Sequence, residues 1–140
     1  MKHYWAAFRR GEPALDREED RVAWRRCNRH ALQHALRLVA THPLLRDQLV
    51  LRGSATLSTW YGPRSREPHD LDWVVRDSSL RMDSAEGREI IGALELVLRA
   101  AHETGELSLW PERIETDVIW TYDRVPGRRV SIPWKRDGLP

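Results

Sequence analysis

Cysteine is nearly absent from this chain: Cys27 is the only one among 140 residues. A single cysteine excludes an internal disulfide and a cysteine-based zinc site, and it is typical of the reducing cytoplasm, where we expect this chain to act. The sequence also has no run of about 18 apolar residues, so it predicts no membrane-spanning helix. No long apolar segment precedes the charges near the N-terminus, and a secretory signal is therefore not expected.

Lysine is almost as scarce, since Lys2 and Lys135 are the only two. Lys and Arg together number 23 against 21 Asp and Glu, a net charge of +2, so bulk charge does not predict a nucleic-acid-binding protein. We attribute most of the arginines to a biased genome composition, although the planar guanidinium also suits phosphate groups. With 41% hydrophobic and 31% charged residues, the composition is that of a soluble folded domain.

The length fits one domain, and we expect a tail at 1–13 followed by a single domain at 14–140. Apolar periodicity and turn residues predict the following elements, in order: helix 14–41, strand 48–52, helix 54–61, strand 70–76, a helix that Asp83 caps and that runs to about residue 103, and strands 113–122 and 128–134 around a turn at 125–127. This order predicts an α+β (mixed α/β) fold, in which helices flank a mixed β-sheet.

Two short motifs carry the chemistry. Gly53-Ser54 joins a predicted strand to a predicted helix, where backbone without a Cβ, a hydroxyl and free helix N–H groups can cradle a phosphate. Asp70-Leu71-Asp72 opens the next strand, and residues i and i+2 of a strand project from the same face. Two adjacent carboxylates repel unless a cation lies between them, and Mg²⁺ prefers such oxygens. The alternative is an acidic junction between a loop and a strand with a structural role only.

Together these motifs resemble the signature of the AbiEii/AbiGii-type nucleotidyltransferase toxins, within the DNA polymerase β-like superfamily. The matching features are an apolar strand at 49–51, Arg52, Gly53-Ser54, an apolar helix at 55–61, Arg66, and Asp70-Leu71-Asp72. Many members have Ser or Thr two residues before the first aspartate, where this chain has Pro68.

The resemblance implies that Gly53, Ser54 and Arg66 bind a nucleoside triphosphate and that Asp70 and Asp72 bind Mg²⁺ or Mn²⁺. It also implies a third carboxylate from a later strand. Asp117 is the candidate within this chain, and the alternative is an aspartate beyond Pro140. Family members are usually longer, with a helical C-terminal half, so we expect that the chain represents the N-terminal, catalytic half. It would then be a truncated chain, a minimal enzyme or one half of a split enzyme.

The implied function is metal-dependent transfer of a nucleoside monophosphate to a hydroxyl of an RNA 3′ end or a protein, in a bacterial toxin–antitoxin or phage-defence system. The implied partners are an antitoxin or a second polypeptide. The polar turn after Trp134 predicts an open sheet edge, through which the chain would either dimerise or bind a second polypeptide. Two alternatives stay open: a degenerate or split enzyme that only binds a nucleotide or partner, and a small-molecule, antibiotic-type nucleotidyltransferase.

Overall fold

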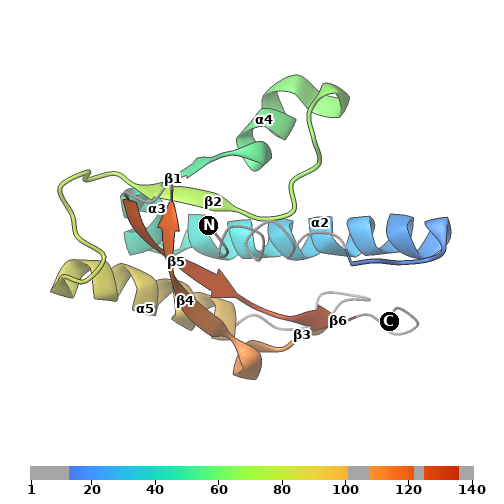
Figure 1. Ribbon diagram of the computed structural model, residues 1–140. Helices are drawn as coiled ribbons and strands as arrows, with labels where there is room; N and C mark the ends of the chain where they lie inside the picture. The colour runs from blue at the N-terminus through green and yellow to red at the C-terminus, as the bar shows by residue number, and fades with distance from the viewer. Residues whose placement is uncertain (1–12, 101–107, 122–124, 136–140) are drawn as a thin grey trace.

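The computed structural model describes residues 13–100, 108–121 and 125–135. Its elements, labelled in Figure 1, are helices α2 (Glu18–Thr41), α3 (Pro43–Gln48), α4 (Ser54–Tyr61) and α5 (Ala85–Arg99), 3₁₀ turns η1 (Gly62–Arg64) and η2 (Pro111–Arg113), and strands β1 (Leu49–Arg52), β2 (Asp72–Val75), β3 (Ser108–Leu109), β4 (Glu115–Thr121), β5 (Val125–Ser131) and β6 (Trp134–Lys135). The expected α+β class is confirmed. In place of one mixed sheet, the described strands form three antiparallel pairs, β1–β2, β3–β6 and β4–β5.

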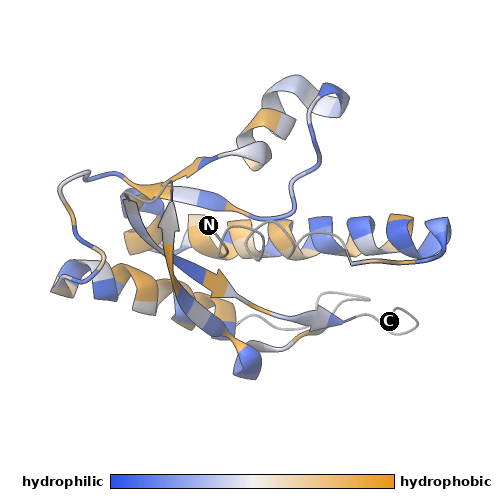
Figure 2. Cartoon of the chain, viewed as in Figure 1, coloured by the Kyte–Doolittle hydropathy of each residue, from blue (hydrophilic) through white to orange (hydrophobic). Residues whose placement is uncertain are grey.

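The main core lies where α2, α3 and α5 meet the β1–β2 pair. Val39, Leu45 and Ile90 are buried there, and Leu45 is fully inaccessible to solvent. Figure 2 shows apolar residues gathered at this junction. Pro43 lies just after the end of α2 at Thr41. Pro43 also begins α3, because proline is well suited to the first turn of a helix, where its missing N–H has no partner to lose.

The β1–β2 pair alternates as a half-buried sheet should. Leu51 lies opposite Trp73, and both side chains are partly buried on the core side. Val50 lies opposite Val74, and both are exposed on the other side, which is also the side of Arg52 and Asp72. The register therefore brings the C-terminal end of β1 next to the first residue of β2.

The turn expected at 125–127 was wrong. Those residues are the first three of β5, which pairs with β4 from Thr121 opposite Val125 to Glu115 opposite Ser131. Gly127 serves packing here, since a Cβ at this position would lie 3.2 Å from Ile119 Cγ1 on the opposite strand. Pro126, which cannot donate a backbone hydrogen bond, is tolerated in a strand whose one described partner is β4.

The strand expected at 128–134 divides into two. β5 ends at Ser131, and β6 begins at Trp134 and pairs with β3, so that Leu109 lies opposite Trp134. Both residues belong to a smaller core around buried Cys27, which β3 and β6 cover at one side of α2.

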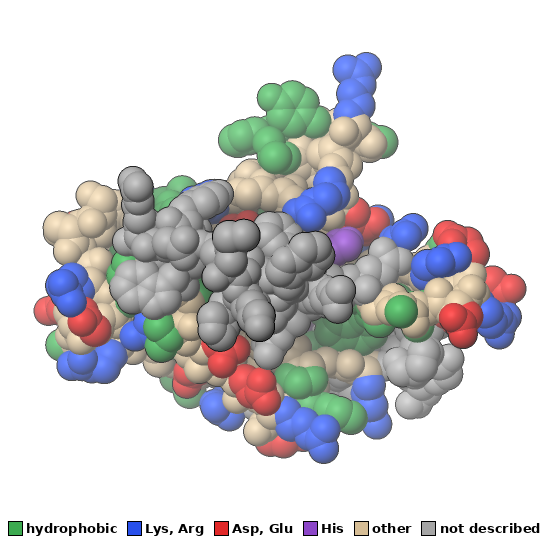
Figure 3. Space-filling view, viewed as in Figure 1, with side chains coloured by type: hydrophobic (Ala, Val, Ile, Leu, Met, Phe, Trp, Pro, Cys, Tyr) green, Lys and Arg blue, Asp and Glu red, His purple; other side chains and the backbone are tan. Residues whose placement is uncertain are grey.

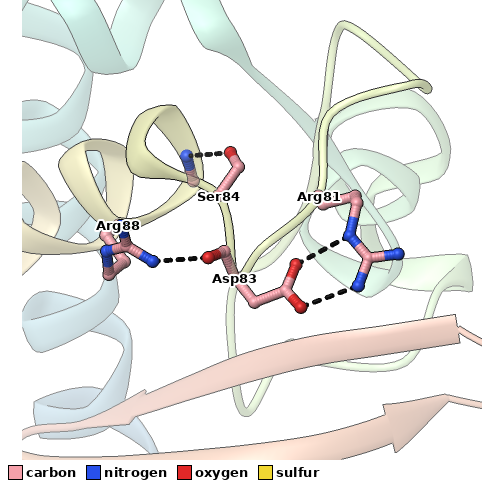
Figure 4. A network of polar contacts seen from close by, with 5 residues as sticks. Arg81, Asp83, Ser84 and Arg88 are labelled. Carbon is pink, nitrogen blue, oxygen red and sulfur yellow. Dashed lines mark hydrogen bonds and ion pairs between the residues drawn. The ribbon is translucent and has the colours of Figure 1, made fainter.

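The N-cap of α5 also differs from expectation. Ser84, not Asp83, accepts the hydrogen bond from the backbone N–H of Gly87, at 3.1 Å. Asp83 instead accepts two hydrogen bonds from Arg81, at 2.9 and 2.7 Å (Figure 4). Serine at this extended position is as good a cap as aspartate, and Asp83 lies one residue too early to reach the first turn.

The helix α4 projects from the body of the molecule, at the top of Figure 1, and packs on β1 and η1. Over the residues that the structure describes, none of the helices combines the length and apolar character that a membrane span requires. The expected tail at 1–13, apart from Pro13, lies outside the described residues, as do the end of the helix near residue 103 and the sheet edge beyond Lys135.

Candidate active site

The contact between Gly53 and Asp72 is the centre of the site. Gly53 caps α4 with φ +75° and ψ −154°, a conformation that is essentially restricted to glycine. A Cβ on Gly53 would stand 2.3 Å from Asp72 Oδ2. Because Arg52 pairs with Asp72 across the two strands, the turn into α4 lies directly against this carboxylate. Glycine is therefore required twice, by the backbone angle and by the space that Asp72 occupies.

The two motif aspartates lie close enough to influence each other. The strand expected at 70–76 begins only at Asp72, so the expectation that Asp70 and Asp72 share one face of a strand was wrong. Asp70 lies in the bend just before β2, and both residues are exposed. Partial burial raises the pKa of the Asp72 carboxyl, and the negative charge of Asp70 raises this pKa further. A carboxylate pair in this state is stabilised by a cation that both can bind.

Three arginines lie within electrostatic reach of Asp72 and lower its pKa, in the order Arg52, Arg66 and Arg129. Each comes from a different part of the chain. Arg52 ends β1, Arg66 lies in the segment between η1 and β2, and Arg129 lies on β5. This combination of two acidic and three basic groups suits a triphosphate that arrives with a divalent cation.

Ser54 is the first residue of α4, next to Gly53. Its Oγ is buried and has no hydrogen-bond partner in the described part of the chain. A buried hydroxyl without a partner carries a desolvation cost, which a ligand that hydrogen-bonds to it would remove. Its neighbour Thr56 differs, because its hydroxyl donates to the carbonyl of Gly53 at 2.8 Å.

Asp117 is exposed on β4 and lies opposite Arg129 of β5. Within 13–100, 108–121 and 125–135, no three His, Cys, Asp or Glu side chains come together as a metal site, so Asp117 does not join Asp70 and Asp72 in one cluster. Arg129 is related to both Asp117 and Asp72: it is the cross-strand neighbour of Asp117, and its charge acts on Asp72.

Sequence analysis did not single out Arg129. In the structure Thr121 pairs with Val125, and this register puts residue 129 opposite residue 117. A turn placed at 125–127 does not lead to this register.

The donor set fits a hard divalent cation. Asp70 and Asp72 offer carboxylate oxygens, with few enough protein ligands to leave positions for phosphate oxygens. Partial burial is the first cause of the raised pKa of Asp72 and the charge of Asp70 is the second, and the arginines around Asp72 do not offset these two effects. Gly53 lies against the same carboxylate, and Ser54 follows it with a hydroxyl group at the start of α4.

A Gly-Ser turn at the start of a helix, beside a strand that begins at the second aspartate of an Asp-x-Asp motif, is the arrangement expected from the resemblance to the nucleotidyltransferases. The family model for the nucleotidyl transferase AbiEii toxin of type IV toxin–antitoxin systems matches residues 35–140, and the chain belongs to this family. The family consists of nucleotidyltransferase toxins that act with an antitoxin. Comparisons with curated proteins and with solved structures found no match.

Proposed function

We propose that this chain transfers a nucleoside monophosphate from a nucleoside triphosphate to an acceptor hydroxyl, with release of pyrophosphate. The observation that carries the proposal is the contact of Gly53 with the Asp72 carboxylate, which unites the phosphate cradle and the carboxylate pair at one point. The acceptor oxygen forms a bond to the α-phosphorus, the bond from that phosphorus to the bridging oxygen breaks, and pyrophosphate leaves with the bonding electrons.

Each residue has a distinct role in this proposal. Gly53 and Ser54 hold the triphosphate, with the Ser54 hydroxyl donating to a phosphate oxygen. Asp70 and Asp72 hold Mg²⁺ or Mn²⁺, which when bound neutralises charge that develops on the phosphate oxygens. Arg66 also binds the triphosphate; its charge already acts on Asp72, so it lies near enough to attract an anion there.

Asp117 is the candidate base that accepts the proton of the acceptor hydroxyl. Its position opposite Arg129 supports this role, because Arg129 lies in the electrostatic field of Asp72. If the acceptor binds between Asp117 and the pair Asp70 and Asp72, its hydroxyl would lie near Asp117 and would face the phosphates of the bound nucleotide. This role needs approach of Asp117 to the pair, since the three carboxylates are not one cluster in the structure.

The surface of α4 and η1 supports an RNA acceptor over a protein hydroxyl. Residues 48–66 contain no Asp or Glu and three arginines, Arg52, Arg64 and Arg66. Trp60 and Tyr61 are 72% and 61% exposed on the projecting helix, where Figure 3 shows hydrophobic and arginine side chains extending from the top of the molecule. Exposed aromatic rings interleaved with arginine stack on nucleic acid bases while the arginines contact phosphates.

The decisive experiment supplies each labelled nucleoside triphosphate in turn with Mg²⁺ and total cellular RNA, and parallel reactions contain RNase-treated lysate or small molecules. We expect label in RNA from the wild-type chain and none from Asp70→Asn or Asp72→Asn. Label in protein or in a small-molecule fraction would overturn the RNA acceptor but keep the transferase. Nucleotide binding without any transfer would overturn the enzyme and indicate a binding module.

A further inference from the structure

The segment that carries Asp70 is attached to α2 at two points. Arg29 of α2 donates from Nε and Nη2 to Glu67 Oε1, at 2.9 and 2.6 Å. Trp24, more than one turn earlier on α2, meets His69 edge to face with ring centroids 5.8 Å apart. Both anchored residues, Glu67 and His69, come shortly before Asp70 in the sequence.

We infer that these four residues, Trp24, Arg29, Glu67 and His69, form a clamp on α2 that positions Asp70 beside Asp72 for metal binding. We call this group the α2 clamp. The inference rests on the proposed function, since it assumes that Asp70 and Asp72 bind the metal as a pair. All four are positioning residues in this inference, because they act through Asp70 and do not touch the metal or the nucleotide.

Asp70 needs such a support because the sheet does not supply one. The pairing of β1 with β2 begins at Arg52 opposite Asp72, so Asp70 lies before the first paired residue. Residues 65–71 belong to no helix or strand. Nevertheless Asp70 and Arg66, which both lie in this segment, act electrostatically on Asp72. Their approach to Asp72 therefore depends on how the segment is held from outside the sheet.

Pro68 strengthens this interpretation. It lies between the two anchored residues, and its ring fixes one backbone angle and restricts the residue before it. The segment from Glu67 to His69 is consequently stiff, so fixing Glu67 and His69 on α2 also limits where the next residue, Asp70, can lie.

The clamp is itself supported by the smaller core. Trp24 lies 6.1 Å, between ring centroids, from Trp134 of β6, which packs against the core around Cys27. The Glu67 side chain is 27% exposed and that of Arg29 is 58% exposed, so solvent screens this ion pair only in part. A second ion pair on the same helix, Arg21 with Glu18 at 2.8 Å, joins residues of α2 alone and provides a control.

The test measures Mn²⁺ affinity by water-proton relaxation on the full chain, together with thermal stability. We expect Arg29→Ala and Glu67→Ala each to weaken Mn²⁺ binding about tenfold, as loss of groups that orient metal ligands generally does. Arg21→Ala should change Mn²⁺ affinity less than twofold, although it should change Tm by as much as Arg29→Ala does. The exchanged pair Arg29→Glu with Glu67→Arg should recover most of the affinity, and His69→Phe, which keeps an aromatic edge contact, should lose less than His69→Ala.

The possible failures are distinguishable. Wild-type affinity in Arg29→Ala and Glu67→Ala would overturn the clamp and leave the metal site intact. If the wild-type chain binds no Mn²⁺ in the presence or absence of nucleotide, the proposed function fails, and the inferred purpose of the clamp fails with it. In that case, amide hydrogen exchange of residues 66–71 still decides the attachment itself: unchanged exchange in Arg29→Ala relative to Arg21→Ala would show that α2 does not hold the segment.

Discussion

Gly53 and Asp72 are in such close contact that a single methyl group on Gly53 would collide with the Asp72 carboxylate, 2.3 Å from its Oδ2 atom. We therefore expect Gly53→Ala to remove transfer activity by displacing Asp72 and the turn into α4. The variant should also lose about 1–3 kcal/mol of unfolding free energy, because alanine is strained at φ +75° and ψ −154°. Chemical denaturation and a labelled-nucleotide assay measure the two effects separately.

Gly62 provides the control for that prediction. It also has a positive φ, +56°, but a Cβ there would have nothing within 4 Å among the described residues. Gly62→Ala should therefore be destabilised through its backbone alone and should keep transfer activity. Equal loss of activity in the two variants, at similar stability, would show that the contact with Asp72 is not what activity depends on.

Substitution of either Asp70 or Asp72 should have the same effect on transfer activity. We expect Asp70→Asn and Asp72→Asn each to reduce transfer more than about 100-fold, since loss of a direct metal ligand should exceed the 10–100-fold effect typical of supporting residues. Neither variant should unfold more easily at neutral pH without metal, because each removes one of two repelling charges. Asp47→Asn, which changes an exposed carboxylate paired with Arg46, is the control for loss of charge alone.

The pKa of Asp72 makes a prediction with a definite sign. Partial burial and then Asp70 raise the pKa of this carboxyl above its usual value. The folded chain therefore holds this proton more tightly than the unfolded chain, and between the two pKa values the stability contributed by this group falls as the pH rises. Carbon-detected NMR titration without metal should give a midpoint above that of an ordinary aspartate. The midpoint should fall in Asp70→Asn and rise in Arg66→Gln, and an unchanged midpoint in both would contradict the assigned causes.

The sequence predicted the local parts of this site better than its long-range parts. The strand, Gly53-Ser54 and the helix 54–61 form a nearly continuous segment with strong turn and periodicity signals, and the structure has each of these elements. The next strand is also present, but it begins at Asp72, so Asp70 lies outside it. The predicted turn was placed too late in the chain because Pro126 and Gly127 are typical turn residues. In the structure both lie in β5, where Gly127 makes room for Ile119.

Contacts between distant segments left no local signal in the sequence. Glu67 lies 38 residues from Arg29, and nothing in the spacing of charges along the chain distinguishes this pair from Arg21 and Glu18 on α2. The cap of α5 shows the same limit at short range. Asp83 and Ser84 are both good caps, and only the position of the first helical turn decides between them.

Arg129 should contribute to nucleotide binding, although only the folded chain indicates it. Its charge acts on Asp72 from β5, so Arg129→Gln should weaken binding of nucleoside triphosphate about tenfold, which is the expected loss for a charge-assisted contact. Arg128 is the matched control, because successive strand residues face opposite sides and its Nη1 donates to the carbonyl of Gly127. Calorimetric titration with a non-hydrolysable nucleotide should show little change in Arg128→Gln. Equal affinity in both variants would remove Arg129 from the site.

Asp117 should affect the chemical step and not nucleotide affinity. As a base that accepts the acceptor's proton, it should contribute about 10²–10⁴-fold to kcat, so Asp117→Asn should lower kcat by that order while the Kd for nucleotide stays within twofold of wild type. Glu115 is the control, since it is an exposed carboxylate two residues earlier on β4 and projects from the same face as Asp117. The Glu115→Gln variant should keep wild-type transfer activity, because Glu115 lies opposite Ser131 and not opposite Arg129. If Asp117→Asn transfers at the wild-type rate, the base is another group, and the position of Asp117 opposite Arg129 serves only to hold that arginine toward Asp72.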